Sequence, residues 1–292
     1  MDSFGSPTVR RRRLAAELRR LRGNRTGNQV ARALGWSPTK VSRAESGKES
    51  LPPTEVEKLI DYYSVAEPLR GRLLELAEDA VKRGWWDDYA DALTPEYLEF
   101  IGLEDEAASC LHWQSDVIPG LLQTEEYSRQ LNVAYQSVVP TIPSSFRDRF
   151  VRVRMRRQER LIREPLLQLS VVIDEAVLLR RIGGHALMRA QLRNLASAAT
   201  LPNVDLRVVR LSQHPGLLAS SFVIMRFGPS ATQEEFLGDV VSTESLATAE
   251  IYVEGETDTR LYSIFFDALH DSALSPTESR QLIIDTSARE WP

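Results

Sequence analysis

The chain is 292 residues long, 42% hydrophobic and 26% charged, which is typical of a soluble globular protein with room for two domains. It contains no apolar run near the roughly 20 residues of a membrane span, and no apolar segment follows its first arginines as a secretory signal requires. The single cysteine, Cys110, excludes an intramolecular disulfide and a four-cysteine zinc site. We therefore expect a cytoplasmic protein.

Charge is distributed unevenly along the sequence. Residues 1–50 contain 12 lysines and arginines and 4 acidic residues, which gives this segment a charge of +8. Since the whole chain carries −5, the remaining residues carry −13. A basic module attached to an acidic body is the layout expected when one part binds nucleic acid and the rest is repelled by it.

The N-terminal part is predicted to be entirely helical. Apolar residues recur at helical spacing, and glycine, proline, serine or threonine mark the ends of each segment. Five short helices are expected: 8–22, Thr26 to Leu34, Ser37 to Gly47, Pro52 to Tyr63, and Pro68 to about Lys82. They make one compact all-α module, which we assign to residues 1–82.

Gly84-Trp85-Trp86 marks the expected boundary with a second domain, residues 83–292, in which helices and strands are mixed. Helices are predicted at 95–106, 124–136, 144–164, 184–199, 257–270 and 276–285. Strands are predicted at 166–173, 204–211, 222–227 and 249–254, with a weaker one at 240–241. Strict βαβ alternation is missing, so the predicted fold class is a multidomain α+β protein: an all-α helix-turn-helix bundle followed by a mixed α+β regulatory domain.

The segment from Thr26 to Gly47 carries the functional signal. Two short helices flank a glycine turn at Gly35, and a small residue on the first helix lets the two cross closely. A shared apolar wedge is expected from Val30, Ala31, Leu34, Val41 and Ala44.

This packing would leave the polar side chains of the second helix facing outward. They can donate hydrogen bonds and two are cationic, so the helix fits a DNA major groove, while the start of the first helix would contact the sugar-phosphate backbone. The expected DNA-binding residues are Asn28, Gln29, Ser37, Thr39, Lys40, Ser42, Arg43 and Lys48. The alternative is an ordinary helical hairpin with a solvated charged face, which the combined caps, turn and Glu-x-Gly ending disfavour.

The same segment resembles the Cro/CI-type, or Xre-family, helix-turn-helix, and the resemblance implies DNA binding. Three features depart from the family pattern. Gly27 stands where glutamine is frequent, Ala44 replaces a larger apolar residue, and the connection at 23–25 is short. The first departure affects a usual phosphate contact, and the other two imply a different packing of the first helix.

Further segments resemble actinobacterial regulators of the WhiJ type, also described as antitoxin-like, along nearly the whole chain. The segments that carry this resemblance are Arg83-Gly84-Trp85-Trp86, 103–107, 117–127, 174–178, 188–192, 201–204 and His214-Pro215-Gly216. The resemblance implies transcriptional regulation and a small BldB-like partner protein.

Few other residues suggest chemistry. Cys110 and His112 would share one face of a strand, but no third ligand has metal-site spacing, so a buried thiol beside a half-exposed imidazole is expected instead of zinc. His214-Pro215-Gly216 is expected to form a turn. Asp174-Glu175 is expected to begin a helix, and Gly183-Gly184 to break one. We therefore expect no metal, no cofactor and no enzymatic activity.

The predicted helix at 144–164 carries eight arginines and permits three interpretations. It could be a solvated helix that pairs with its own Asp148, Glu159 and Glu164, it could bind an acidic partner surface, or it could add phosphate contacts. The partner interpretation would use Arg152, Arg156 and Arg160.

Taken together, these features predict a transcriptional regulator that binds double-stranded operator DNA as a homodimer, in the cytoplasm and on the nucleoid when bound. Its second domain would bind a small partner protein or a ligand. Two alternatives stay open. The chain could be an interaction scaffold, or its second domain could act on a small molecule while the DNA-binding head only localises it.

Overall fold

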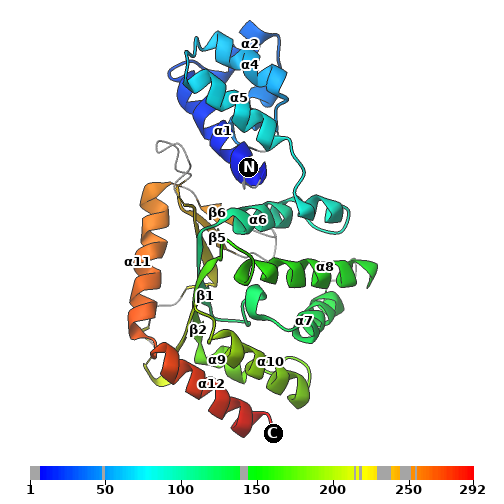
Figure 1. Ribbon diagram of the computed structural model, residues 1–292, viewed down its shortest axis with the longest axis vertical. Coiled ribbons are helices and arrows are strands. Elements are labelled where there is room, and N and C mark those ends of the chain that lie inside the picture. The colour runs from blue at the N-terminus through cyan, green and yellow to red at the C-terminus, as the bar shows by residue number, and fades with distance from the viewer. Residues whose placement is uncertain are drawn as a thin grey trace. The chain divides into compact units, whose positions relative to one another are not determined.

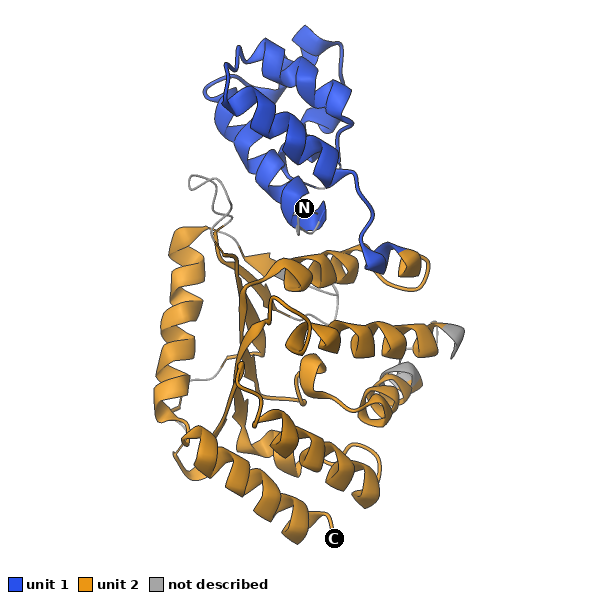
Figure 2. Ribbon diagram, viewed as in Figure 1, with its two compact units in different colours: residues 1–87, 229–237 blue, residues 88–228, 238–292 orange. Residues whose placement is uncertain are grey.

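The computed structural model describes residues 7–47, 50–138, 144–213, 215–216, 219–228, 238–243, 251–253 and 255–292. The chain divides into two compact units, with the main boundary between Asp87 and Asp88 (Figure 2). No helix in the described ranges combines the length and the apolar character needed to cross a bilayer.

Unit 1 contains the five short helices predicted from the sequence. They are α1 (Pro7–Arg22), α2 (Gly27–Leu34), α3 (Pro38–Glu45), α4 (Pro53–Tyr62) and α5 (Leu69–Ala80). Their apolar faces meet in one core, in which Leu18, Val30, Val41, Leu59 and Ile60 are almost completely buried. The expected wedge between α2 and α3 is part of this core.

Local sequence signals determine where α2 and α3 begin and end. Thr26 and Gln29 form a capping box, because each side chain accepts a hydrogen bond from the backbone N–H of the other. Gly35 ends α2 with φ of 68°, a left-handed conformation that costs little without a Cβ. Ser37 then caps α3 by accepting a hydrogen bond from the N–H of Lys40.

Unit 2 is built on a six-stranded mixed sheet with the order β3-β2-β1-β4-β5-β6 (Figure 1). The strands are β1 (Ser109–Gln114), β2 (Gln168–Asp174), β3 (Val204–Val209), β4 (Phe222–Arg226), β5 (Val240–Thr243) and β6 (Ile251–Val253). β1, β2 and β3 are parallel, whereas β4, β5 and β6 are each antiparallel to their neighbours. The weaker predicted strand at 240–241 is confirmed as part of β5, and within the predicted strand 249–254 the described residues form β6.

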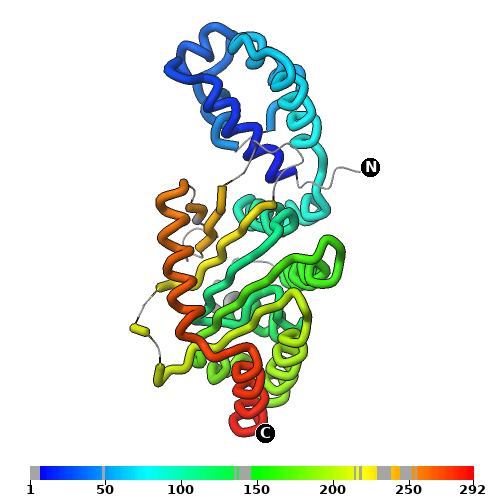
Figure 3. Tube along the Cα trace, turned by 60° about the vertical axis from the view of Figure 1, so that its left-hand side comes forward, coloured from blue at the N-terminus to red at the C-terminus, as the bar shows by residue number. Residues whose placement is uncertain are grey.

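Helices cover both faces of this sheet. They are α6 (Pro95–Glu106), α7 (Glu125–Val138), α8 (Ser144–Arg157), α9 (Glu175–Leu179), α10 (His185–Ala198), α11 (Glu256–Ser272) and α12 (Pro276–Glu290). α11 lies along one face, and α6, α7, α8 and α10 lie on the other (Figures 1 and 3). The predicted fold class is therefore confirmed: a helical first unit is followed by a mixed unit of helices and strands.

Alternation along β1 gives the two faces of the sheet different roles. Leu111 and Trp113 belong to the apolar core on the α11 side, where Phe266 is among the buried residues. Cys110 and His112 point to the opposite face and are also buried. The sheet face opposite α11 therefore carries a buried thiol and a buried imidazole.

The arginine-rich helix is shorter than the sequence predicts. α8 ends at Arg157, a 3-10 turn follows over residues 158–161, and the N–H of Leu167 then donates a hydrogen bond to the carbonyl of Arg160. The chain turns here because β2 must start beside β1. No glycine or proline occupies the turn itself, so the sequence gives no sign of this helix end.

A buried ion pair joins α6 to α8. The Nε and Nη2 atoms of Arg157 donate hydrogen bonds of 2.7 and 2.8 Å to the carboxylate of Glu104, and Nη1 donates one of 2.6 Å to the hydroxyl of Tyr97. Arg157 is 5% exposed and Glu104 is 1% exposed. Burial by itself would lower the pKa of Arg157, but the adjacent Glu104 and Tyr97 raise that pKa above its ordinary value, so the guanidinium stays charged.

Replacing Glu104 with glutamine is expected to lower the free energy of unfolding by about 3–5 kcal/mol, because it leaves a buried guanidinium without its counter-charge. Urea denaturation of the full chain followed by circular dichroism measures this loss. Asp105→Asn is the matched control, since Asp105 pairs with the half-exposed Arg163 and its loss should cost less than about 1 kcal/mol. Equal losses in the two variants would contradict the special role of the buried pair.

Candidate DNA-binding surface and buried polar pocket

The exposed face of α3 carries three of the eight predicted DNA-binding residues. Thr39, Ser42 and Arg43 are exposed, whereas Val41 and Ala44 on the same helix are buried against the core of unit 1. The helix therefore has one locked face and one polar face, as the sequence predicts. Hydroxyl and guanidinium groups on a solvent-facing helix are suited to hydrogen bonding with base edges in a major groove.

Lys40 is held more firmly than the sequence suggests. Its ammonium group lies 2.6 Å from a carboxylate oxygen of Glu55 on α4 and 4.7 Å from the centre of the Trp36 ring. The side chain is 30% exposed. A DNA phosphate or base would have to compete with Glu55 for this ammonium group, which makes Lys40 a weaker contact than its charge alone implies.

One of the two polar residues in the first turn of α2 makes hydrogen bonds within the protein. Asn28 and Gln29 are both exposed, but the amide oxygen of Gln29 accepts hydrogen bonds from the backbone N–H and the hydroxyl of Thr26. A phosphate would therefore meet the amide nitrogen of Gln29. Ser37 is exposed, and its hydroxyl accepts the hydrogen bond that caps α3. Lys48 lies outside the described residues.

Two N-terminal arginines bind residues at and just after the end of α3. Arg22 on α1 forms two hydrogen bonds of 2.9 Å to the carboxylate of Glu45 at the end of α3. Arg11 donates a hydrogen bond of 2.7 Å to the carbonyl of Gly47. Some of the positive charges in residues 1–50 therefore make contacts within the protein. A count of charges along the sequence attributes all of them to attraction for DNA.

The other sequence candidates have structural roles. Asp174 caps α9 through a 2.7 Å bond from the N–H of Ala176, which confirms that Asp174-Glu175 begins a helix. Gly184 precedes α10, as expected of a helix break. His214 lies outside the described residues. Within the described ranges no group of three or more histidine, cysteine or acidic side chains is arranged to hold a metal ion.

Two arginines of α8 and the following turn, Arg157 and Arg160, are buried. Arg160 is buried and donates hydrogen bonds to the carbonyls of Ala107 and Pro165, so its predicted place in a partner surface is corrected. Arg152 and Arg156 are exposed, one turn apart. None of the three interpretations of this arginine-rich segment predicted that some of its arginines would form hydrogen bonds inside unit 2.

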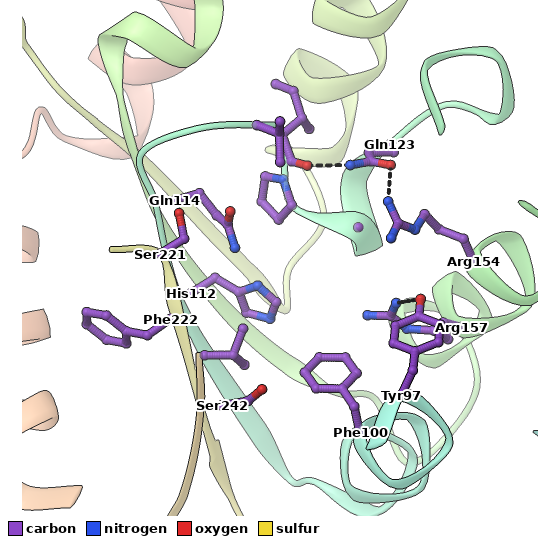
Figure 4. A pocket seen from close by; sticks show the side chains of 15 residues that line it. Tyr97, Phe100, His112, Gln114, Gln123, Arg154, Arg157, Ser221, Phe222 and Ser242 are labelled. Carbon is purple, nitrogen blue, oxygen red and sulfur yellow. Dashed lines mark hydrogen bonds between the residues drawn. The ribbon is translucent and has the colours of Figure 1, made fainter. Parts of the chain in front are cut away.

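A pocket of about 60 Å³ lies between the sheet and α8 (Figure 4). Its floor includes His112 and Gln114 on β1 and Ser242 on β5, and Arg154 and Arg157 face it from α8. Sequence reasoning missed this site because its residues come from distant segments. The register of the sheet brings them together: Val223 pairs with His112 on one side and with Ser242 on the other.

His112 is fully buried, which corrects the expected half-exposed imidazole. Neither ring nitrogen has a hydrogen-bond partner in the described part of the chain. Burial, together with the nearby charge of Arg157, lowers the pKa of His112 to about 3. The imidazole is therefore neutral near pH 7 and offers one donor and one acceptor. Burial likewise raises the pKa of Cys110 well above its ordinary value, so the thiol stays protonated near pH 7.

Replacing His112 with glutamine is expected to make unfolding less sensitive to acid. The unfolded imidazole takes up a proton near pH 6.5 and the folded one only near pH 3, so lowering the pH between these values stabilises the unfolded chain. One proton gives a slope of at most about 1.4 kcal/mol per pH unit, or about 2 kcal/mol between pH 6.5 and 5. Urea denaturation at pH 7 and pH 5 measures the difference.

The control for this experiment is His185→Gln, because His185 is exposed. This variant should keep the acid sensitivity of the unchanged protein. An identical pH dependence for His112→Gln and the unchanged protein would show that His112 is not buried in its neutral form.

Comparison with known families matches the two units separately. A helix-turn-helix domain model matches residues 13–73, which include α2 and α3. No curated protein and no solved structure matches the chain. A second family model matches residues 97–285, well over half of the sequence and most of unit 2. The protein therefore belongs to the family defined by the domain of unknown function DUF5753, here preceded by a helix-turn-helix domain.

Proposed function

We propose that the protein is a sequence-specific transcriptional regulator that reads operator DNA with α3. The observation that carries this proposal is the arrangement of α3 itself: its apolar side is fixed by the core of unit 1, and Thr39, Ser42 and Arg43 stand on its exposed side. A rigid helix with such a face can enter a major groove without rearrangement. The resemblance to Xre-family proteins agrees with this role.

The residues of the surface divide into two groups. Arg43 is suited to reading guanine through its O6 and N7 atoms, and Thr39 and Ser42 can bond to either strand. Asn28 and Gln29, at the start of α2, and Lys40, already paired with Glu55, are suited to phosphate contacts that fix the position of the domain.

A homodimer is the functional form that we propose. One helix-turn-helix contacts only a short half-site, and a dimer on a palindromic operator doubles the contacts with half-sites about 34 Å apart. Binding to the nucleoid in the cytoplasm follows from this function.

Unit 2 is proposed to regulate DNA binding by holding a small BldB-like partner protein or a ligand. Arg152 and Arg156 form an exposed pair on α8, and arginine is favoured at protein interfaces. We propose binding and no catalysis for this unit. Burial lowers the pKa of His112 to about 3, so its imidazole is neutral near pH 7 and can exchange hydrogen bonds with a bound molecule.

Replacing Arg43 with alanine is expected to weaken binding to a selected operator duplex by about 1–3 kcal/mol if it reads a guanine. Affinity for a scrambled duplex should fall much less. Fluorescence anisotropy with operators selected from a random pool, at one fixed salt concentration, measures both values.

Arg70→Ala on α5 is the control, since it also removes one positive charge from unit 1 but Arg70 is paired with Glu57 and Asp61. This variant should keep the ratio of specific to non-specific affinity. An unchanged ratio in Arg43→Ala would remove Arg43 from the base-reading residues, and indifference of the unchanged protein to every duplex would favour the scaffold alternative.

Charge reversal at Arg152 and Arg156, each to glutamate, is expected to weaken the complex with a small BldB-like protein at least tenfold, because like charges would then face an acidic partner surface. Titration of the full-length proteins against each other gives the dissociation constant. Arg193→Glu, a reversal at an exposed position of α10, should have little effect. If the double reversal leaves the complex intact, α8 is not the partner surface.

A further inference from the structure

The pocket of unit 2 lies where the order of the strands reverses. From β1 the chain passes to β2 on one side of it and later to β4 on the other. Gln114, at the end of β1, and Phe222, at the start of β4, both line the pocket at this point. In open parallel sheets ligands bind at the carboxyl ends of the strands where the order reverses, and here the carboxyl end of β1, which is parallel to β2, lies at this point.

The absence of a side chain at Gly120 opens a space between two guanidinium groups. A Cβ at this position would lie 3.5 Å from Nη1 of Arg157, and 3.6 Å from both Nη2 of Arg157 and Nε of Arg154. Nitrogens of both arginines therefore lie close to the face of Gly120 that a side chain would cover. An anionic oxygen that packs beside this bare glycine would lie near both guanidinium groups.

The charges around this space leave one positive charge uncompensated. Glu104 neutralises Arg157 through two hydrogen bonds, and none of the residues that line the pocket is acidic. Arg154 donates its Nη1 to the neutral side chain of Gln123, and its buried Nε has no partner among the described residues. The Nε–Nη2 edge therefore remains to bind a carboxylate through two parallel hydrogen bonds.

The rest of the pocket suits the organic part of a ligand. The rings of Phe100 and His112 are turned toward the space between the sheet and α8 (Figure 4), and Val223 adds an apolar contact. Both nitrogens of the buried imidazole are without partners in the described structure. A polar group of a bound molecule would recover part of the free energy that this burial costs.

We propose that this pocket binds a small organic monocarboxylate, with the carboxylate between Arg154 and Arg157 above Gly120 and a polar substituent within reach of His112. The volume of about 60 Å³ restricts the enclosed part of the molecule to a few heavy atoms. The single uncompensated positive charge of Arg154 can be neutralised by one negative charge, so a monoanion is favoured. A phosphate dianion would leave its second negative charge in the pocket without a positive partner. As an effector site this pocket rests on the proposed regulatory function, but binding to it requires no DNA.

The test is a ligand-observed NMR titration of the full chain with acetate, propionate, lactate and benzoate. The matched neutral probes are acetamide, propionamide, lactamide and benzamide, and inorganic phosphate is included as the dianion. At least one carboxylate should bind, with an affinity at least tenfold above that of its amide and above that of phosphate.

Two variants locate the bound carboxylate. Gly120→Ala fills the space between the guanidinium groups at ordinary contact distances, so it should fold normally and raise the dissociation constant at least tenfold. Arg154→Gln should raise it by a similar factor. The controls are Gly238→Ala, at an exposed glycine with open space around its Cβ position, and Arg152→Gln, on the exposed side of α8, and both should bind as the unchanged protein does.

Three outcomes would overturn the proposal: no carboxylate binds, amides or phosphate bind as tightly as the carboxylates, or Gly120→Ala and Arg154→Gln bind as well as their controls. Circular dichroism and thermal unfolding of each variant establish that lost binding is not lost folding. The titration contains no DNA, so the two proposals are tested independently. If no carboxylate binds, the prediction for Arg43 and operator DNA is unaffected. If the protein binds no operator, the prediction of carboxylate binding in the pocket is unaffected.

Discussion

The ion pair between Arg157 and Glu104 is the contact on which the arrangement of unit 2 depends. It fixes α8 against α6, places the hydroxyl of Tyr97 against the same guanidinium, and forms the wall of the pocket opposite the sheet. A charge buried this deeply is tolerated only because the carboxylate and the hydroxyl together satisfy its donors. The charge of Arg157 lowers the pKa of His112 further than burial alone would, so this residue also affects which groups the pocket offers to a ligand.

Arginine has two distinct uses in this protein. In unit 1, Arg22 binds Glu45 and Arg11 binds the carbonyl of Gly47, so part of the basic N-terminal segment stabilises the position of α3. In unit 2, arginine side chains reach inward to carbonyl and carboxylate groups of the same domain. Because a planar guanidinium can satisfy several acceptors at once, it suits both uses. A count of positive charges therefore overstates the attraction for DNA, and Arg43, exposed on α3, is the more informative residue.

The two units carry candidate sites of different kinds. α3 is locked into a compact core and needs no ligand to adopt its shape, as a base-reading element requires. Unit 2 contains a polar pocket in which the imidazole of His112 and the Nε of Arg154 lack partners in the described structure. Native interiors seldom leave such groups unpaired, so the pocket offers donors and acceptors to a bound molecule. A domain that is completed by a small molecule or a partner is suited to sensing.

The sequence by itself determined the helices of unit 1, the turn between α2 and α3 and the outward face of α3, because caps, a left-handed glycine and apolar spacing are local signals. It also determined most strands of unit 2, whose apolar runs are equally local. Only the tertiary structure decided that α8 ends at Arg157, that Lys40 is paired with Glu55 and that His112 is buried. The pocket belongs to this second group, since strand pairing and helix packing bring its residues together from segments far apart in the chain, and no local pattern records which of them will meet.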